Sequence, residues 1–117
     1  MAAYQLLTSA DEIAPLFEES SKRPVLFFKH SLTCPISGAA FREYENFLAD
    51  RAEDEVLYTL VELQNARPVS QAITDTSGVR HESPQAILVQ GGEVVWHASH
   101  WKIRKDALEN AVAEARA

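Results

Sequence analysis

The segment FKHSLTCPISGAAF, residues 28–41, contains the only cysteine of the chain, Cys34. A thiol can serve as a nucleophile, as half of a disulfide or as a metal ligand, and its nucleophilic form is the thiolate. Ser37 follows three residues later, where a dithiol redox enzyme carries the second cysteine of its Cys-x-x-Cys motif. The spacing predicts thiol chemistry in which one sulfur acts without a second thiol in the same chain.

The residues around Cys34 predict where the thiol lies. The run PVLFFKH, residues 24–30, is typical of a strand buried on both faces, and apolar residues recur at helical spacing from Pro35 onward. Proline suits the first turn of a helix, so we expect Cys34 at a helix N-terminus. There the free N–H groups of Ile36 and Ser37 and the helix dipole favour a thiolate. Such sites lower a cysteine pKa from about 8.5 to roughly 3.5–7.5, which favours a reactive thiol over a small buried apolar residue.

Three neighbouring polar residues could tune the thiol. Lys29 and His30 could each add positive potential, but successive side chains of a strand point to opposite faces, so only one of them faces the sulfur, and we favour His30. The Ser37 hydroxyl could donate to the thiolate or satisfy the start of the helix, and both interpretations stay open.

The remaining pattern predicts five strands and four helices in the order βαβαβαββα. This order predicts an α/β fold with a mixed central sheet and helices on both faces. Ser9 and Glu12 have the spacing of a capping box, and two glycines in QGG at 90–92 predict a hairpin turn. The expected strands are 3–8, 24–30, 55–63, 85–89 and 93–99, and the expected helices run from Ser9 to Ser20, from Pro35 to Leu48, from Pro68 to Gly78, and over 103–115.

Composition limits the classes of function. The 117 residues suit a single domain, 1–117, and the net charge of -6 with no dense basic run argues against nucleic acid as a partner. The longest apolar run is too short to cross a membrane, and the N-terminus lacks the pattern of a secretory signal. A lone thiol suits a reducing compartment, so we expect a cytoplasmic location.

The dipeptide SP at 83–84 directly precedes the strand QAILV, and it is the second informative motif after Cys-x-x-Ser. Cys-x-x-Ser at the start of a helix together with this proline resembles the thioredoxin fold, in which a cis-proline faces the active-site cysteine. More narrowly, FKHSLTCPIS, VRHESPQAILV and SHWKI resemble the monothiol bacilliredoxins (the YtxJ-like family), whose hallmark is Thr-Cys-Pro-Ile-Ser. That pentapeptide stands at residues 33–37.

The resemblance implies an enzyme that reduces mixed disulfides between proteins and bacillithiol, a small thiol that acts as co-substrate, with no tightly bound cofactor. Cys34 would be the nucleophile, Pro84 the cis-proline and Ser83 a source of backbone hydrogen bonds. The expected partners are bacillithiolated client proteins, bacillithiol and possible reductants among other redoxins. The other substrate contacts that it implies lie in the pentapeptide, at Thr33, Pro35 and Ile36.

The lone cysteine fixes the implied reaction. A thiolate attacks a disulfide and leaves a mixed disulfide, which Ser37 cannot resolve, so the adduct waits for an external thiol. The resemblance implies that Cys34 attacks the bacillithiol sulfur, frees the client cysteine and carries bacillithiol as a mixed disulfide. The malate of bacillithiol carries two carboxylates, which need basic or N–H-rich surroundings. Candidate contacts for it are Lys29, Arg80, Trp101 and Lys102.

Other classes of function stay open at this point. Some monothiol glutaredoxins hold an iron-sulfur cluster, but they carry Cys-Gly-Phe-Ser, from which Pro35 and Ile36 depart. A zinc site of Cys34 with histidines lacks a recognised ligand spacing, and a cysteine hydrolase lacks a signature. A non-catalytic sensor or partner-binding module with this fold is the main alternative.

Overall fold

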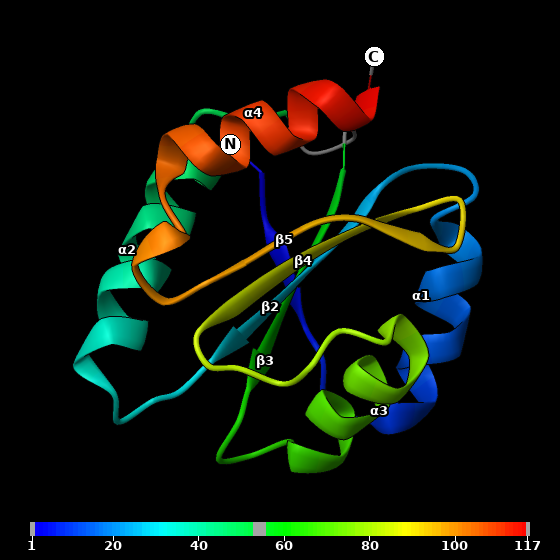
Figure 1. Ribbon diagram of the computed structural model, residues 1–117, viewed down its shortest axis with the longest axis horizontal. Coiled ribbons are helices and arrows are strands. Elements are labelled where there is room, and N and C mark those ends of the chain that lie inside the picture. The colour runs from blue at the N-terminus through cyan, green and yellow to red at the C-terminus, as the bar shows by residue number, and fades with distance from the viewer. Residues whose placement is uncertain (1, 53–55, 117) are drawn as a thin grey trace.

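The computed structural model describes residues 2–52 and 56–116, drawn as coloured ribbon in Figure 1. The expected order βαβαβαββα is confirmed, with two short 3₁₀ turns added. Glu55, the first residue of the strand expected at 55–63, lies outside the described residues. The strands are β1 (Tyr4–Leu6), β2 (Val25–His30), β3 (Leu57–Glu62), β4 (Gln85–Gln90) and β5 (Glu93–Ser99). The helices are α1 (Ile13–Glu19), α2 (Pro35–Ala49), α3 (Arg67–Ser77) and α4 (Lys105–Arg116), and the 3₁₀ turns are η1 (Ala10–Glu12) and η2 (His100–Lys102).

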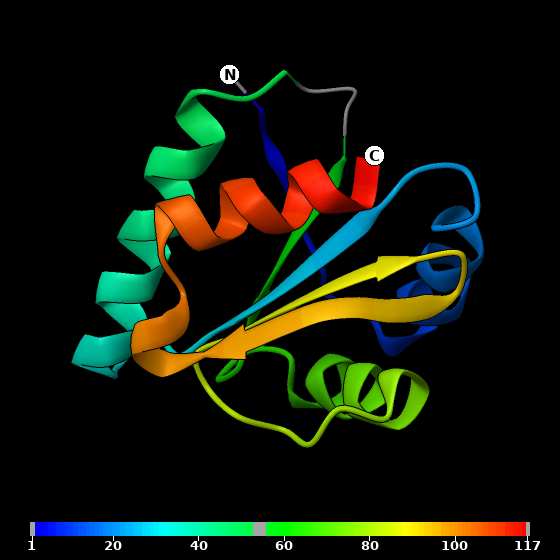
Figure 2. The same cartoon turned by 45° about the horizontal axis from the view of Figure 1, so that its top comes forward.

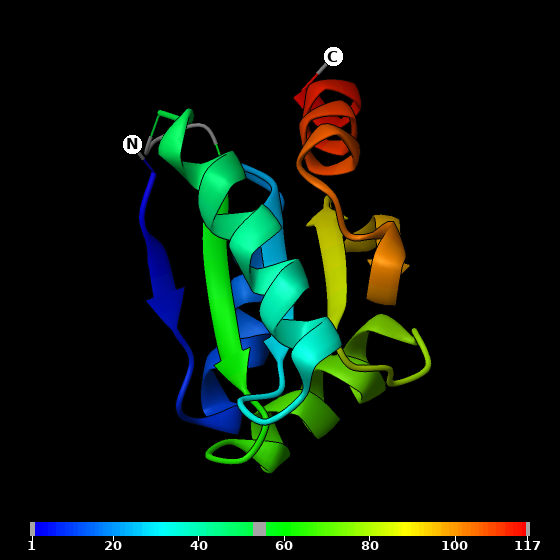
Figure 3. The ribbon, with the colours of Figure 1, turned by 90° about the vertical axis from the view of Figure 1, so that its left-hand side faces the viewer.

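The five strands form one mixed sheet in the order β1-β3-β2-β4-β5. β1, β3 and β2 run parallel, whereas β4 lies antiparallel to β2 and to β5. β2 is the central strand, and all six of its residues are buried, as its unbroken apolar run predicts. Figure 3 shows β1 at one edge of the twisted sheet, next to β3.

Helices cover both faces of the sheet, as Figure 2 shows with α4 and α3 on opposite sides. Leu26 and Phe28 of β2 pack in the core beneath α2 and α4. The alternate residues Val25 and Phe27 pack in a second core beneath α1 and α3. The two-residue period of β2 therefore divides the interior into two apolar layers.

Local sequence signals explain several boundaries. Ser9 and Glu12 form the expected capping box, but it opens η1, which runs directly into α1. Gly78 ends α3 in the left-handed conformation at φ 75°, where a side chain would be strained. The expectation that Ile103 begins the last helix was wrong. Ile103 has extended backbone after η2 and is buried, and the helix starts at Lys105.

The packing of α2 on β2 decides where the first turn of α2 lies. The rings of Tyr44 and Phe28 stack at 4.6 Å between centroids, and the rings of Phe41 and His30 stack at 4.7 Å. The buried Tyr44 hydroxyl donates to the Thr59 carbonyl oxygen at 2.9 Å. Aromatic rings and one buried hydrogen bond thus hold α2 to the two central parallel strands.

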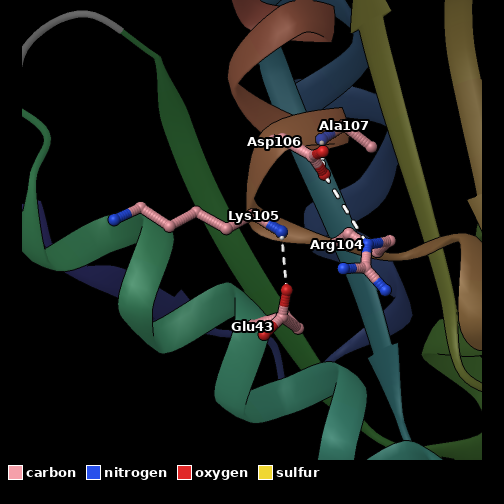
Figure 4. Close-up of polar contacts among 5 residues, drawn as sticks. All are labelled: Glu43, Arg104, Lys105, Asp106 and Ala107. Carbon is pink, nitrogen blue, oxygen red and sulfur yellow. Dashed lines mark hydrogen bonds and ion pairs between the residues drawn. The ribbon is translucent and has the colours of Figure 1, made fainter.

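The far side of α2 is tied to the start of α4. Glu43 Oε1 accepts a hydrogen bond from the backbone N–H of Lys105 at 2.9 Å (Figure 4). Asp106 accepts from the N–H of Ala107 at 2.8 Å and so satisfies one first-turn donor of α4. The hydrogen bond between Glu43 and Lys105 holds the segment that follows η2 beside α2.

The Tyr44 hydrogen bond gives a test of this anchoring. Tyr44→Phe removes the buried hydroxyl and keeps the ring, so the free energy of unfolding should fall by about 1 kcal/mol. Urea unfolding measures the change. Tyr4→Phe is the matched control at an exposed tyrosine and should change stability by less than about 0.5 kcal/mol. Equal effects at the two positions would contradict the anchoring role.

Candidate active site

Cys34 is the N-cap residue of α2, with φ -96° and ψ 124°, and Pro35 follows in the first turn. Its carbonyl oxygen accepts the first helical hydrogen bond, from the N–H of Gly38 at 3.0 Å. The side chain makes no capping hydrogen bond and is half-buried. The sulfur therefore stands at the positive end of a helix and remains accessible to a disulfide.

Ser37 is fully buried and its hydroxyl is engaged away from the thiol. Ser37 Oγ accepts from the N–H of Ser31 at 2.8 Å and lies 2.8 Å from His30 Nδ1. The structure therefore gives Ser37 a role other than donation to the thiolate or satisfaction of the helix start. Ser37 holds together the end of β2 and the loop that leads to Cys34, while donation to the thiolate stays a prediction.

His30 lies on the α2 face of the sheet, against Ser37 and Phe41. Burial lowers its pKa, and the nearby carboxylates of Glu62 and Glu45 offset part of this effect. The expectation that His30 adds positive charge is therefore corrected, because a ring with a lowered pKa is mainly neutral at pH 7. Its place beside Ser37 makes it a support for the loop.

Gln64, which the sequence analysis missed, braces the loop before Cys34. Its Oε1 accepts from the N–H of Leu32 at 3.0 Å, and its Nε2 donates to Ser31 Oγ at 3.0 Å and to Thr33 Oγ1 at 3.3 Å. One side chain from the β3–α3 loop thus fixes three consecutive residues. No sequence pattern signals such a contact, because the partners lie more than 30 residues apart.

The proline loop lies at the same end of the sheet as Cys34. The Ser83–Pro84 peptide bond is cis, and the Pro84 carbonyl oxygen accepts from the N–H of His100 at 3.1 Å. Pro84 directly precedes Gln85, which pairs with Lys29 near the end of β2. Ser83 Oγ is buried without a hydrogen-bond partner in the described part of the chain. The roles of Ser83 and Pro84 in binding stay predictions.

Lys29, a candidate contact for the malate, does not lie at the surface, and its role in binding stays a prediction. The residue is 0% exposed and faces away from α2, toward α3. Its Nζ donates to Thr74 Oγ1 at 2.9 Å and lies 3.1 Å from His81 Nδ1. Burial lowers the pKa of Lys29 to about 8. A buried, mainly protonated lysine thus stands one residue before the histidine that supports the thiol loop.

The other predicted contacts lie on different sides of the site. Trp101 is 67% exposed and lines a cavity of about 310 Å³ together with Arg42 of α2. Lys102 and Arg80 are exposed and belong to η2 and to the loop before Pro84. No described contact joins either residue to Cys34, so their roles, like those of the exposed Thr33 and Pro35 and the half-buried Ile36, stay predictions.

Metal-ligating side chains do not gather within residues 2–52 and 56–116, where no group of three or more is found. Nor is any described helix long and apolar enough to span a membrane. At this end of the sheet the described residues place one accessible thiol on a braced loop.

The pKa of Lys29 gives a prediction for stability. An unfolded lysine has a pKa of about 10.4, so between pH 8 and 10 the unfolded chain binds more protons than the folded one. The free energy of unfolding must then rise with pH, as the buried charge is lost. Wild type should gain stability relative to Lys29→Met between pH 7 and pH 10 in thermal unfolding. Lys22→Met, at an exposed lysine, is the control, and a difference that is flat with pH would refute the buried charge.

Comparison with known proteins identifies the family of this chain. A family model described as monothiol bacilliredoxin BrxC matches residues 5–108. A solved structure, described as a thioredoxin-fold protein of proposed oxidoreductase activity, is 34% identical, with 92% of each chain covered and a TM-score of 0.80.

Thioredoxins share the fold at lower identity. Thioredoxin from Malassezia sympodialis is 16% identical, with 100% of this chain and 94% of that chain covered and a TM-score of 0.74. The short form of thioredoxin f from spinach chloroplast is 18% identical, with both chains fully covered (100%) and a TM-score of 0.73. These two support the fold alone. The family model that matches residues 5–108 and the 34% identical structure show that this thioredoxin-fold thiol–disulfide oxidoreductase belongs to the monothiol bacilliredoxin family.

Proposed function

We propose that this protein removes bacillithiol from mixed disulfides with proteins and carries the small thiol on Cys34. The observation that supports this most is the combination of an accessible thiol at the N-terminus of α2 with Ser37, buried and hydrogen-bonded, at the resolving position. No second cysteine exists in the chain. The adduct on Cys34 must therefore leave by reaction with a thiol from outside.

The first step is a thiol–disulfide exchange at the bacillithiol sulfur. The Cys34 thiolate forms a new S–S bond to that sulfur, the old S–S bond breaks, and the client cysteine leaves as a thiolate. In the second step another bacillithiol thiolate attacks the adduct. This step gives oxidised bacillithiol, a disulfide of two bacillithiols, and restores the Cys34 thiolate, so electrons and atoms balance over the cycle.

The partners and location follow from this cycle. The partners are bacillithiolated client proteins and bacillithiol itself, and a second redoxin is an alternative reductant for the adduct. The cycle uses no tightly bound cofactor. A reducing compartment keeps the lone thiol available, so we assign the reaction to the cytoplasm.

Turnover distinguishes this enzyme from a thiol sensor. Purified protein, mixed with a bacillithiolated client and excess reduced bacillithiol, should free many equivalents of client thiol. Cys34→Ala should reduce the rate to that of bacillithiol alone, because it removes the nucleophile. Release of a single equivalent by wild type would instead indicate a sensor, and visible absorbance after anaerobic purification would indicate an iron-sulfur carrier.

A second prediction concerns the residue that sets the one-thiol cycle. Ser37→Cys supplies a resolving thiol, so the bacillithiol adduct should give way to an internal disulfide between residues 34 and 37. Intact mass after reaction with oxidised bacillithiol measures the product. Ser37→Ala is the matched control and should retain the adduct. Persistence of the adduct in both variants would show that residue 37 does not control its lifetime.

A further inference from the structure

A second cavity, of about 210 Å³, lies along α3 on the face of the sheet opposite α2. Its walls come from three parts of the chain, which are the end of β3, α3 and the loop before Pro84. The lining residues are Leu63, Arg67, Ser70, Gln71, Thr74 and His81. All but Leu63 carry hydrogen-bonding side chains, so the cavity is suited to a polar ligand.

Positive charge gathers at this cavity in a protein that is acidic overall. Lys29, which is bonded to the lining residues Thr74 and His81, brings a buried ammonium, and Arg67 brings an exposed guanidinium. The pKa of His81 is lowered by burial first and then by the positive charges of Lys29 and Arg67, and the Glu82 carboxylate offsets part of this effect. The basic side chains of Lys29, Arg67 and His81 are therefore close enough to interact electrostatically at this cavity.

The hydrogen bonds of Lys29 fix the donors that a ligand would meet. A protonated amine only donates, so Lys29 Nζ donates to His81 Nδ1 and the neutral ring carries its proton on Nε2. Thr74 accepts a second Lys29 proton, and the third finds no partner within the described residues. The imidazole of His81 and the guanidinium of Arg67 therefore offer donors at the cavity wall, while the Lys29 ammonium adds positive charge behind that wall.

The nearby carboxylates form no ion pair with these basic groups in the described part of the chain. Asp75 of α3 accepts from Gln71 Nε2 at 2.9 Å. The carboxyl of Glu82 has a lowered pKa chiefly because the Ser99 side chain hydrogen-bonds to it. Within residues 2–52 and 56–116, neither Lys29 nor Arg67 forms an ion pair. An unpaired buried ammonium is costly, and an anion would offset that cost.

The cavity adjoins the two loops that frame Cys34. Leu63 begins the β3–α3 loop, whose Gln64 is hydrogen-bonded to Thr33, the residue before Cys34. His81 belongs to the loop that ends at the cis-proline Pro84. The cavity and Cys34 therefore share these two loops at one end of the sheet.

We infer that this cavity is a carboxylate-binding subsite, with Arg67 and His81 on its wall and Lys29 buried behind Thr74 and His81, which receives the acidic end of the small thiol. The inference rests on the proposed function for the identity of that thiol. Of the four contacts expected for the malate, it keeps only Lys29, which lies behind the cavity wall, and it adds Arg67 and His81 on that wall. The subsite would discriminate between thiols by charge, because a thiol that lacks carboxylates would leave the buried ammonium unpaired.

Binding of L-malate alone tests the subsite without any turnover. In a titration followed by amide NMR, malate should give saturable shifts in α3 and residues 79–82, and its uncharged diamide should not. Arg67→Gln and His81→Leu should each weaken malate binding roughly tenfold or more, because each removes a charged or charge-assisted donor. Lys22→Gln removes an exposed charge at the other end of β2 and should have no effect. Non-saturable shifts, variants that bind as wild type, or tighter binding of inorganic phosphate than of malate would overturn the inference.

Kinetics then tests the link to the thiol. Arg67→Gln should raise the KM for bacillithiol several-fold with little change in kcat, whereas the control Lys22→Gln should leave both unchanged. Malate binding combined with an unaltered KM for bacillithiol would overturn the assignment to the thiol. Malate binding without any bacillithiol turnover in wild type would refute the proposed function but leave the carboxylate subsite in place, so the two failures are distinguishable.

Discussion

The packing of α2 on the central strand is the constraint on which the site depends. Tyr44 stacks on Phe28, and Phe41 stacks on His30, so about one turn of the helix is packed directly on the central strand. Because Cys34 is the N-cap residue of that helix, the same packing fixes the position of the thiol relative to the sheet. The start of the loop between strand and helix is held by Ser37 and Gln64, which accept hydrogen bonds from two consecutive backbone N–H groups. A lone thiol without a second cysteine thus gains a defined location from neutral contacts rather than from a covalent link.

The division of the sheet into two faces separates two chemical tasks. His30 and Lys29 are neighbours in sequence but point to opposite faces of β2. His30 faces α2, where burial keeps it mainly neutral and suits it to support the thiol loop. Lys29 faces α3, where its charge is retained up to about pH 8. In the account developed above, the first face holds the reacting sulfur, and the second holds the group that recognises the acidic part of its partner.

Sequence patterns predicted the elements well because each rested on a local physical signal. The apolar run of β2, the proline after Cys34 and the paired glycines at 91 and 92 each favour one backbone conformation, and the structure adopts it. Lys29 shows where such reasoning stops. A charged residue at the end of an apolar run is usually exposed, but here Thr74 and His81, 45 and 52 residues away, provide its partners. Gln64 could not be predicted for the same reason, because a contact between two loops produces no repeating pattern in the sequence.

The central claim is that Cys34 attacks the small-thiol sulfur and carries it as an adduct. A rapidly quenched single turnover of wild type with a bacillithiolated client, with the protein read by intact mass, tests this claim most directly. We predict that the first product is Cys34 bonded to bacillithiol, which appears together with free client thiol. A mixed disulfide between Cys34 and the client, with bacillithiol released first, would contradict the account.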